Sequence, residues 1–313
     1  MRTIKIITIA LTLTLGIKAI NAQQAPMYTH YMYNTLSVNP AYAGSRDALT
    51  ITALHRSQWV SFKGAPMTQT LTMHAPLKNE HIGLGLSASN DRIGPINNTS
   101  VFGNFAYILK MTPKSKLAFG LSAGANILQA NLSTLQLDNQ SDPTFQKDIS
   151  NRVTPNFGFG AYYYREKFYV GLSIPNILEN NYLATNQVNG AQLLAKEQRH
   201  YFLIAGTMIE FSENVALKPT MLVKVTSAVP IQADLTASFI FMKRFLIGGM
   251  FRSGDAFGVL AGLDITKQFH LGYSFDWSYG LKTSVYNNGS HELVLRYDFL
   301  TPNKKQIHTP RNF

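Results

Sequence analysis

The 313-residue chain contains no cysteine, and after residue 22 every apolar run is broken within a few positions by a polar residue, glycine or proline. A membrane-spanning helix needs about 20 consecutive apolar residues, so an α-helical membrane protein is excluded. Disulfides cannot stabilise the chain. Acidic residues are scarce, with 17 Asp and Glu against 28 Lys and Arg. Because this basic surplus is spread thinly, without basic blocks interleaved with aromatics, no nucleic-acid partner is expected.

Residues 1–22 have the composition of a secretory signal peptide. Arg2 and Lys5 precede an apolar run over residues 6–16, and Ala22 ends a stretch of small residues. We expect cleavage after Ala22 and export of the remaining chain. The stability of an exported, cysteine-free protein must come from a large core or from lipid.

Alternation of apolar and polar residues dominates the rest of the chain. In 268–279 the residues Phe269, Leu271 and Tyr273 alternate with small or polar ones, as in a half-buried strand. The same pattern predicts about fourteen strands, mostly long enough to cross a bilayer when tilted. The predicted strands are 48–58, 66–76, 81–91, 98–110, 115–130, 155–165, 167–175, 199–212, 214–226, 230–242, 244–252, 256–265, 267–279 and 290–299.

The connections between these strands alternate in length. A soluble β-sandwich or a lipocalin-like barrel also has alternating strands, but short turns at one end and longer loops at the other are typical of outer-membrane barrels. The short ones are Pro76–Glu80, Met111–Lys114, Arg165–Lys167, Ser212–Asn214, Met242–Arg244 and Thr266–Gln268, and the long ones are Asn131–Thr154, Asn176–Gln198 and Gly280–Gly289.

The sequence therefore predicts an all-β protein, a transmembrane antiparallel up-and-down barrel with periplasmic N- and C-termini, in contact with outer-membrane lipid. Residues 23–47 are expected to form an N-terminal periplasmic or plug-like segment, 48–300 the barrel, and 301–313 a periplasmic C-terminal tail. Aromatic residues near strand ends are typical of interfacial girdles. They are Trp59, Tyr107, Tyr162, Tyr163, Tyr164, Tyr201, Phe251 and Trp277.

The inward positions of two neighbouring predicted strands are polar. Such a lumen, if empty, conducts small solutes as a porin does. If it is filled by the N-terminal segment or by a client chain, it is a docking component, and the residues alone leave both possibilities open. These inward positions are Lys218, Thr220, Lys224, Thr226, Gln232, Asp234, Thr236 and Ser238.

Catalytic motifs are missing from the sequence. There is no thiol nucleophile and no serine in a G-x-S-x-G elbow. The eight histidines show none of the spacings that zinc sites use. We therefore expect neither enzymatic activity nor a metal or other cofactor.

An ordered series of short motifs resembles the PorP/SprF family of the type IX secretion system of Bacteroidota. The first three together are highly specific, and the series extends through essentially the whole mature chain. The motifs are Tyr31–Asn34, Asn39–Asp47, Arg56–Trp59, Gly64–Pro66, Asn90–Pro95, Gly171–Pro175, Lys218–Thr220, Phe251–Ser253, Gly272–Asp276 and Gly289–Leu293.

The resemblance implies an outer-membrane barrel that supports secretion or surface retention of large adhesins in gliding or adhesion. The implied partners are the C-terminal sorting domain of the secreted adhesin and the periplasmic components of the secretion system. Candidate contact residues follow from the motifs and the tail, although residues of the N-terminal motifs could equally lock the N-terminal segment against the barrel wall. They are Asn39, Pro40, Tyr42, Arg46, Arg56, Gln58, Trp59, Arg311 and Phe313.

Overall fold

The computed structural model describes residues 26–78, 80–135, 148–186, 190–227, 229–279 and 287–300. The expected signal peptide 1–22 and the expected periplasmic tail 301–313 lie outside these residues. The described residues form antiparallel strands and three short 3-10 helices. The helices are η1 (Thr35–Ser37), η2 (Pro40–Tyr42) and η3 (Leu132–Thr134). The strands are β1 (Leu49–Ser57), β2 (Met67–Pro76), β3 (Ile82–Ile93), β4 (Ile96–Thr112), β5 (Ser115–Ala130), β6 (Ile149–Arg165), β7 (Phe168–Ile174), β8 (Asn181–Asn186), β9 (Gly190–Lys196), β10 (His200–Thr207), β11 (Ile209–Ser212), β12 (Val215–Thr226), β13 (Val229–Phe241), β14 (Phe245–Arg252), β15 (Ala256–Asp264), β16 (Phe269–Ser278) and β17 (Ser290–Phe299).

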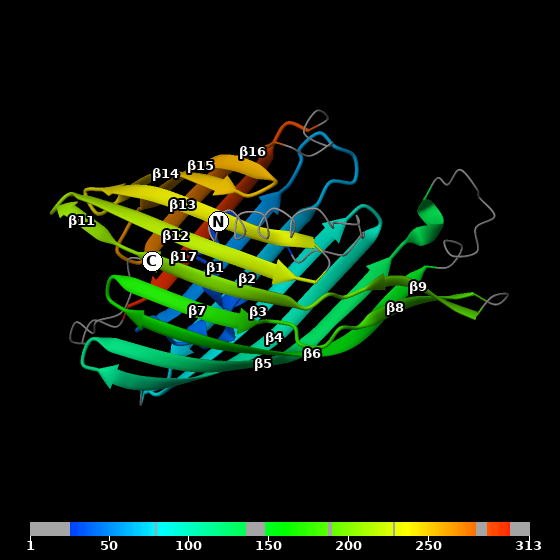
Figure 1. Ribbon diagram of the computed structural model, residues 1–313, viewed down its shortest axis with the longest axis horizontal. Coiled ribbons are helices and arrows are strands. Elements are labelled where there is room, and N and C mark those ends of the chain that lie inside the picture. The colour runs from blue at the N-terminus through cyan, green and yellow to red at the C-terminus, as the bar shows by residue number, and fades with distance from the viewer. Residues whose placement is uncertain are drawn as a thin grey trace, which may run out of the picture.

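The described strands close into a barrel (Figure 1). Each barrel strand pairs with its neighbours in chain order, and β1 pairs with β17 to close the ring. β10 and β11 are one barrel strand interrupted at Met208, because both pair with β12. The result is a closed antiparallel barrel of 14 strands, which confirms the predicted fold class.

The strand boundaries agree closely with the alternation pattern, with three differences. β6 begins at Ile149 rather than at 155, because a positive φ at Asn151 and a register shift opposite Leu128 interrupt the alternation there. The expected loop Asn176–Gln198 contains the hairpin β8–β9, a separate two-stranded sheet. The expected strand 199–212 is divided at Met208.

The two ends of the barrel differ, as the connections predict. At the left of Figure 1 the strands are joined by tight turns such as 113–114 and 213–214, and we call this the short-turn end. The opposite long-loop end carries β8–β9 and η3. Parts of the expected loops Asn131–Thr154 and Gly280–Gly289 lie outside the described residues.

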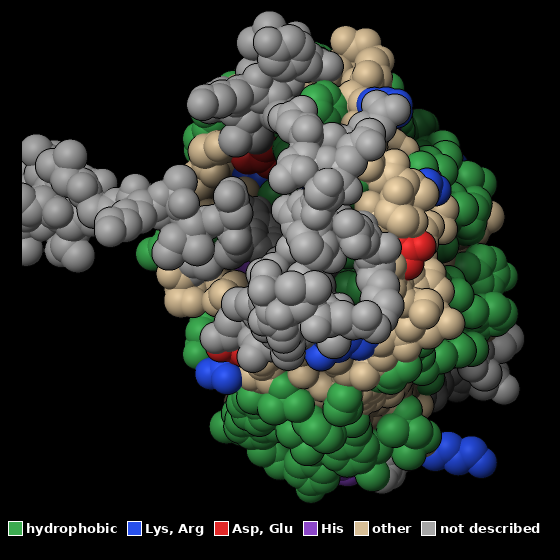
Figure 2. Space-filling model, turned by 90° about the vertical axis from the view of Figure 1, so that its right-hand side faces the viewer, with side chains coloured by type: hydrophobic (Ala, Val, Ile, Leu, Met, Phe, Trp, Pro, Cys, Tyr) green, Lys and Arg blue, Asp and Glu red, His purple; other side chains and the backbone are tan. Residues whose placement is uncertain are grey.

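Side chains alternate between the outside of the barrel and the lumen. On β17, Leu293 and Leu295 are 41% and 36% exposed, whereas Glu292 and Arg296 are 1% and 7% exposed. The outer surface is correspondingly apolar, as Figure 2 shows from the long-loop end. Such an outward apolar band is the surface that a bilayer covers. Among the described residues, no helix is long and apolar enough to cross a membrane.

The expected aromatic girdle is only partly correct. Tyr107, Tyr201 and Trp277 face outward and are 47%, 45% and 43% exposed. Tyr162 and Tyr164, by contrast, are buried in the lumen. Successive side chains on a strand point to opposite faces, so three consecutive tyrosines cannot all lie in the girdle.

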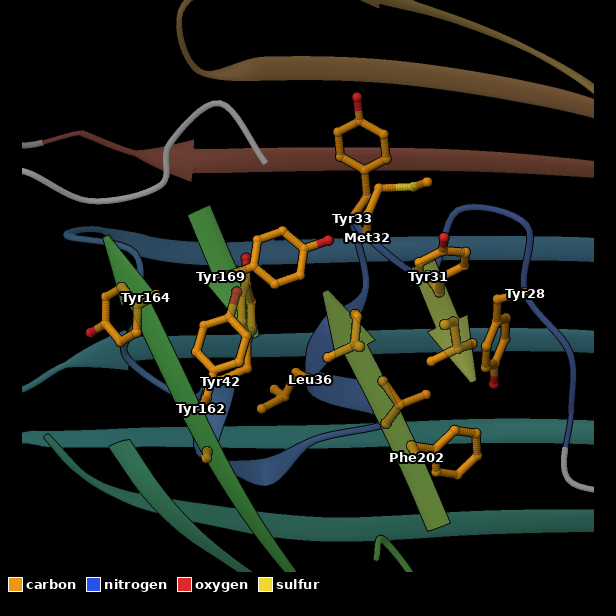
Figure 3. Close-up of a cluster of buried hydrophobic side chains, with 14 of the residues drawn as sticks. Tyr28, Tyr31, Met32, Tyr33, Leu36, Tyr42, Tyr162, Tyr164, Tyr169 and Phe202 are labelled. Carbon is orange, nitrogen blue, oxygen red and sulfur yellow. The ribbon is translucent and has the colours of Figure 1, made fainter. Parts of the chain in front are cut away.

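The N-terminal segment, defined here as residues 26–47, lies inside the barrel (Figure 3). It starts at the long-loop end, where Thr29 contacts Glu292, and finishes at the short-turn end, where Arg46 contacts Asp298. The segment thus runs through the lumen from the long-loop end to the short-turn end, and β1 then returns to the long-loop end. The tyrosines and aliphatic side chains of the segment form the main buried cluster of the molecule.

Glycines in the wall let the backbone of the segment come close. A Cβ added to Gly83 would collide with the carbonyl oxygen of Ala43, and one added to Gly120 would collide with the backbone nitrogen of Ala41. Both glycines therefore form part of the seat of the segment.

Replacing Gly120 with Ala is expected to lower the stability of the folded barrel by ~1–3 kcal/mol, because backbone must move to admit the methyl group. Thermal unfolding followed by circular dichroism in detergent would measure the loss. Gly103→Ala is the matched control, because a Cβ there would have only an ordinary contact, 3.8 Å from the oxygen of Ala123. Equal unfolding temperatures for the two variants would contradict this close packing.

Candidate functional site

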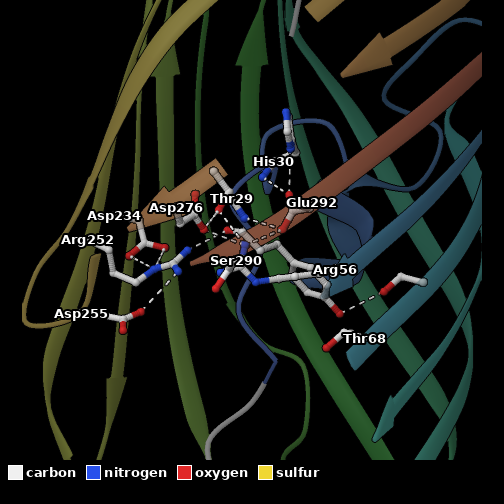
Figure 4. Close-up of polar contacts among 12 residues, drawn as sticks. Thr29, His30, Arg56, Thr68, Asp234, Arg252, Asp255, Asp276, Ser290 and Glu292 are labelled. Atoms are coloured by element: carbon white, nitrogen blue, oxygen red, sulfur yellow. Dashed lines mark hydrogen bonds and ion pairs between the residues drawn. The ribbon is translucent and has the colours of Figure 1, made fainter. Parts of the chain in front are cut away.

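The candidate site is the filled lumen, and its strongest polar contact lies near the long-loop end (Figure 4). Glu292 of β17 accepts hydrogen bonds from the backbone nitrogens of Thr29 and His30 at 2.9 and 2.6 Å. The His30 imidazole lies 2.8 Å from the same carboxylate. Arg56 of β1 approaches Glu292 at 3.2 Å and Asp276 of β16 at 2.8 Å. One buried carboxylate thus binds two backbone amides of the segment and a guanidinium of the wall.

A second buried guanidinium completes this layer. Arg252 of β14 donates from Nε to both oxygens of Asp234 at 3.0 Å. Its Nη2 donates to the carbonyl oxygen of Tyr28 at 3.2 Å, and its Nη1 lies 3.5 Å from Asp255. Arg252 is 0% exposed. A charge buried so fully requires partners, and the segment supplies one of them.

A separate ion pair holds the other end of the segment. Arg46 donates to Asp298 of β17 through Nε at 3.2 Å and Nη2 at 2.8 Å, a two-pronged contact. Thr50 of β1 adds a hydrogen bond of 2.7 Å to the same carboxylate. Between the two layers, the Tyr33 ring lies under Lys218 and Arg296, at 4.5 and 5.1 Å from its centroid.

Packing and backbone contacts fix the middle of the segment. The Asn39 amide donates to the carbonyl oxygens of Ala161 and Leu172 at 3.1 and 3.4 Å. Ser173 donates to the carbonyl oxygen of Val38 at 2.6 Å. Tyr42 packs edge-on against Tyr162, with ring centroids 5.4 Å apart. The segment is therefore bound along its length and not only at its ends.

Little open volume remains around the segment. A cavity of about 150 Å³ opens at the long-loop end between Tyr28, Val38, Asn98 and Asn126. Two hollows deeper in the lumen, beside Lys224 and Lys218, have about 10 Å³ or less. A hollow of about 10 Å³ is at the lower limit for one water molecule, and the smaller one is too tight for any. No described group of three or more His, Asp and Glu side chains is arranged to hold a metal ion.

The structure divides the candidate contact residues into three groups. Asn39, Pro40, Tyr42, Arg46 and Arg56 are buried in the lumen, where they bind the segment to the wall or belong to it. Gln58 and Trp59 are partly exposed at the long-loop end, beyond β1. Arg311 and Phe313 lie outside the described residues.

The contacts that hold the segment from the wall side could not be predicted from the sequence. Alternation in 290–299 puts Glu292, Arg296 and Asp298 on the face opposite Leu293 and Leu295, and the structure has them, like the predicted Asp234, in the lumen. Their partners could not be assigned, because Thr29 and His30 contact Glu292 across more than 260 positions of sequence. A buried charge on an alternating strand is a signal that some partner exists, but it does not identify that partner.

The closed barrel, its apolar outer surface and its occupied lumen define the class: an outer-membrane β-barrel. The model of the family described as type IX secretion system membrane protein PorP/SprF matches residues 20–297. The chain belongs to this family, which confirms the resemblance seen in its motifs, and its location is the outer membrane.

Two solved structures illustrate what the chain is similar to in fold. The CymD monoaromatic hydrocarbon channel is 13% identical, with 91% of this chain and 96% of that chain covered and a TM-score of 0.50. The outer membrane protein Omp33 of Acinetobacter baumannii is 12% identical, with 81% and 99% covered and a TM-score of 0.45. At these identities the likeness concerns the fold alone. The comparison with curated proteins finds no match.

Replacing Arg46 with Gln is expected to destabilise the protein by ~3–5 kcal/mol, because Asp298 then loses its two-pronged partner while it stays buried. Urea unfolding in detergent, followed by tryptophan fluorescence, would measure this. The control is Lys110→Gln, which breaks the pair with Glu80 at 3.2 Å on the surface, where Lys110 is 48% exposed. That exposed pair should contribute at most ~1 kcal/mol, and an equal effect of both variants would contradict a locked segment.

Proposed function

We propose that this protein is an accessory barrel of type IX secretion that supports the secretion or surface attachment of a large adhesin carrying a C-terminal sorting domain. The family match over residues 20–297 is the observation that carries the proposal. The occupied lumen adds support. A barrel that is filled by its own N-terminal segment is better suited to docking a partner protein than to conducting small solutes.

The client is proposed to bind the long-loop end while the segment stays in place. In outer-membrane barrels the longer loops face the cell exterior, where a surface adhesin is retained. Gln58 and Trp59 lie at this end and remain proposed contacts. We assign Asn39, Pro40, Tyr42, Arg46 and Arg56 an indirect role, because they are buried and position the segment.

The periplasmic components of the secretion system are the second class of proposed partner. They would reach the short-turn end, to which the tail 301–313 is attached through β17. Arg311 and Phe313 are the proposed contacts in that tail.

A passive pore for small solutes is the alternative. The lumen is polar, with Thr220, Thr236 and Asp234 facing inward. However, Tyr31 occupies this place, with its hydroxyl 2.9 Å from Thr220. Conduction would require the segment to leave, with loss of the Glu292 and Asp298 contacts. The family is one of secretion-system membrane proteins, and we propose no enzymatic activity for this chain.

Deleting the gene is expected to remove one large adhesin from the cell surface, detected by surface proteolysis and mass spectrometry. The intact gene should restore it. A variant with Asn34→Cys and Thr72→Cys should also restore it once mass spectrometry shows that oxidation has joined the two thiols. The Asn34 amide oxygen and the Thr72 hydroxyl oxygen are 2.8 Å apart, so a disulfide between these neighbouring positions would hold the segment on β2. The cysteine-free chain allows this test without competing thiols.

An unchanged set of surface adhesins in the deletion strain would contradict the secretion role. Restoration by the reduced but not by the oxidised double-cysteine variant would contradict a segment that stays in place.

A further inference from the structure

One side of the outer wall changes from apolar to polar between two successive rows of outward-facing side chains. This side is formed by β1, β2, β3, β4 and β17. The strand registers align outward-facing side chains into rows around the barrel. One row is apolar: Leu295, Ala53, Leu71, Ala88 and Val101. The next row toward the long-loop end is Leu293, His55, Gln69, Asn90 and Thr99.

This polar row is local to one side of the barrel. On β15 and β16 the outward side chains near the long-loop ends are Phe257 and Trp277, which are 50% and 43% exposed and stack with ring centroids 5.7 Å apart. Aromatic rings are the usual side chains at a membrane boundary. The polar row instead puts one imidazole and two amide groups side by side at this boundary, where they can form hydrogen bonds with a lipid headgroup. His55 is oriented by Ser57, 3.1 Å from its Nε2.

A hollow of about 380 Å³ lies where the two rows meet. Its apolar part is lined by Ala53, Leu71, Ala88 and Leu295, and its polar edge by His55, Gln69 and Asn90. The small alanine side chains make the depression between larger neighbours. An apolar floor with a polar edge on the long-loop side matches one amphiphile standing upright in the outer leaflet.

The lining also indicates the headgroup. None of the residues that line the hollow is Asp, Glu, Lys or Arg, and the next outward cation on β3, Arg92, stands one row farther toward the long-loop end. Neutral amides that both donate and accept suit a hydroxyl-rich sugar better than a phosphate, which favours cationic partners. Asn90 is held in place, since its amide nitrogen donates to Asn97 and Thr99 at 2.8 Å each.

We propose that this hollow binds one glycolipid of the outer leaflet, with an acyl chain on the alanine floor and sugar hydroxyls on His55, Gln69 and Asn90. The site lies on the outer wall, so it is independent of the client and of the lumen. It gives the barrel a preferred lipid on one face.

The wall on the other side provides a matched control. A larger hollow of about 680 Å³ is lined by Ala205, Pro219, Ala237 and Gly249, among other residues. It has no amide or imidazole group in its lining. It should accept an acyl chain without selecting a sugar headgroup.

The test is native mass spectrometry of the full-length protein purified from outer membranes in mild detergent and delipidated. It is then mixed with a purified short-chain lipopolysaccharide, with the same lipopolysaccharide after removal of its phosphates, or with phosphatidylglycerol. Both forms of the lipopolysaccharide should bind alike, and loss of binding on removal of the phosphates would overturn recognition of the sugar. The wild-type protein should retain one lipopolysaccharide. Ala88→Phe, which fills the hollow, and the pair Gln69→Leu with Asn90→Leu, which removes the polar edge, should each reduce binding about tenfold or more. Ala237→Phe should leave it unchanged.

Folding of each variant is checked by the heat-dependent change in its electrophoretic mobility. Filling the hollow and removing its polar edge are independent changes, so one of them still tests the proposal if the other variant does not fold. Equal lipopolysaccharide binding by the wild type and the folded hollow variants would overturn the proposal. Preferential retention of phosphatidylglycerol by the wild type would also overturn it.

Discussion

Everything inside the barrel depends on the need of buried charges for partners. The wall places Glu292, Asp276, Asp234, Arg252 and Arg296 in the lumen, where exposure is at most 7%. A buried ion without partners costs several kcal/mol. The N-terminal segment satisfies part of this need with backbone amides at Thr29 and His30, a carbonyl at Tyr28 and the Arg46 guanidinium. The wall and the segment are therefore complementary halves of one core.

That complementarity shapes the rest of the molecule. Ionic contacts lie at both ends of the segment. Between them aromatic rings fill the space: Tyr31, Tyr42 and Tyr162 pack there, and the Tyr33 ring lies under Lys218 and Arg296. Glycines in the wall bring the two backbones together at Ala41 and Ala43. The outer surface is apolar over most of its area, as a bilayer-covered face requires, with polar side chains at His55, Gln69 and Asn90.

Much of the fold could be predicted from the sequence because a barrel strand repeats every two residues. The orientations of Leu293, Glu292 and Asp298 followed from that period alone. Tyr162 and Tyr164 did not, since an aromatic ring near a strand end suits a girdle and a filled lumen equally well. The hairpin β8–β9 was missed because a two-stranded sheet outside the membrane need not alternate between lipid and lumen.

The candidate site was less predictable than the fold. Motifs identified Asn39, Arg46 and Arg56 as special but left open whether they bind a client or the wall, and only the three-dimensional contacts distinguish the two roles. The path of the segment from the long-loop end to the short-turn end depends on contacts such as Thr29 with Asp276, 247 positions apart. No local pattern contains such information.

The central claim is that the N-terminal segment closes the lumen of the intact protein. Single-channel recording of the purified, full-length protein in planar lipid bilayers tests this claim most directly. The structure predicts no steady conductance, because the segment and its ionic contacts occupy the path from one end of the barrel to the other. A steady, long-lived channel carrying small ions through the wild-type protein would contradict it.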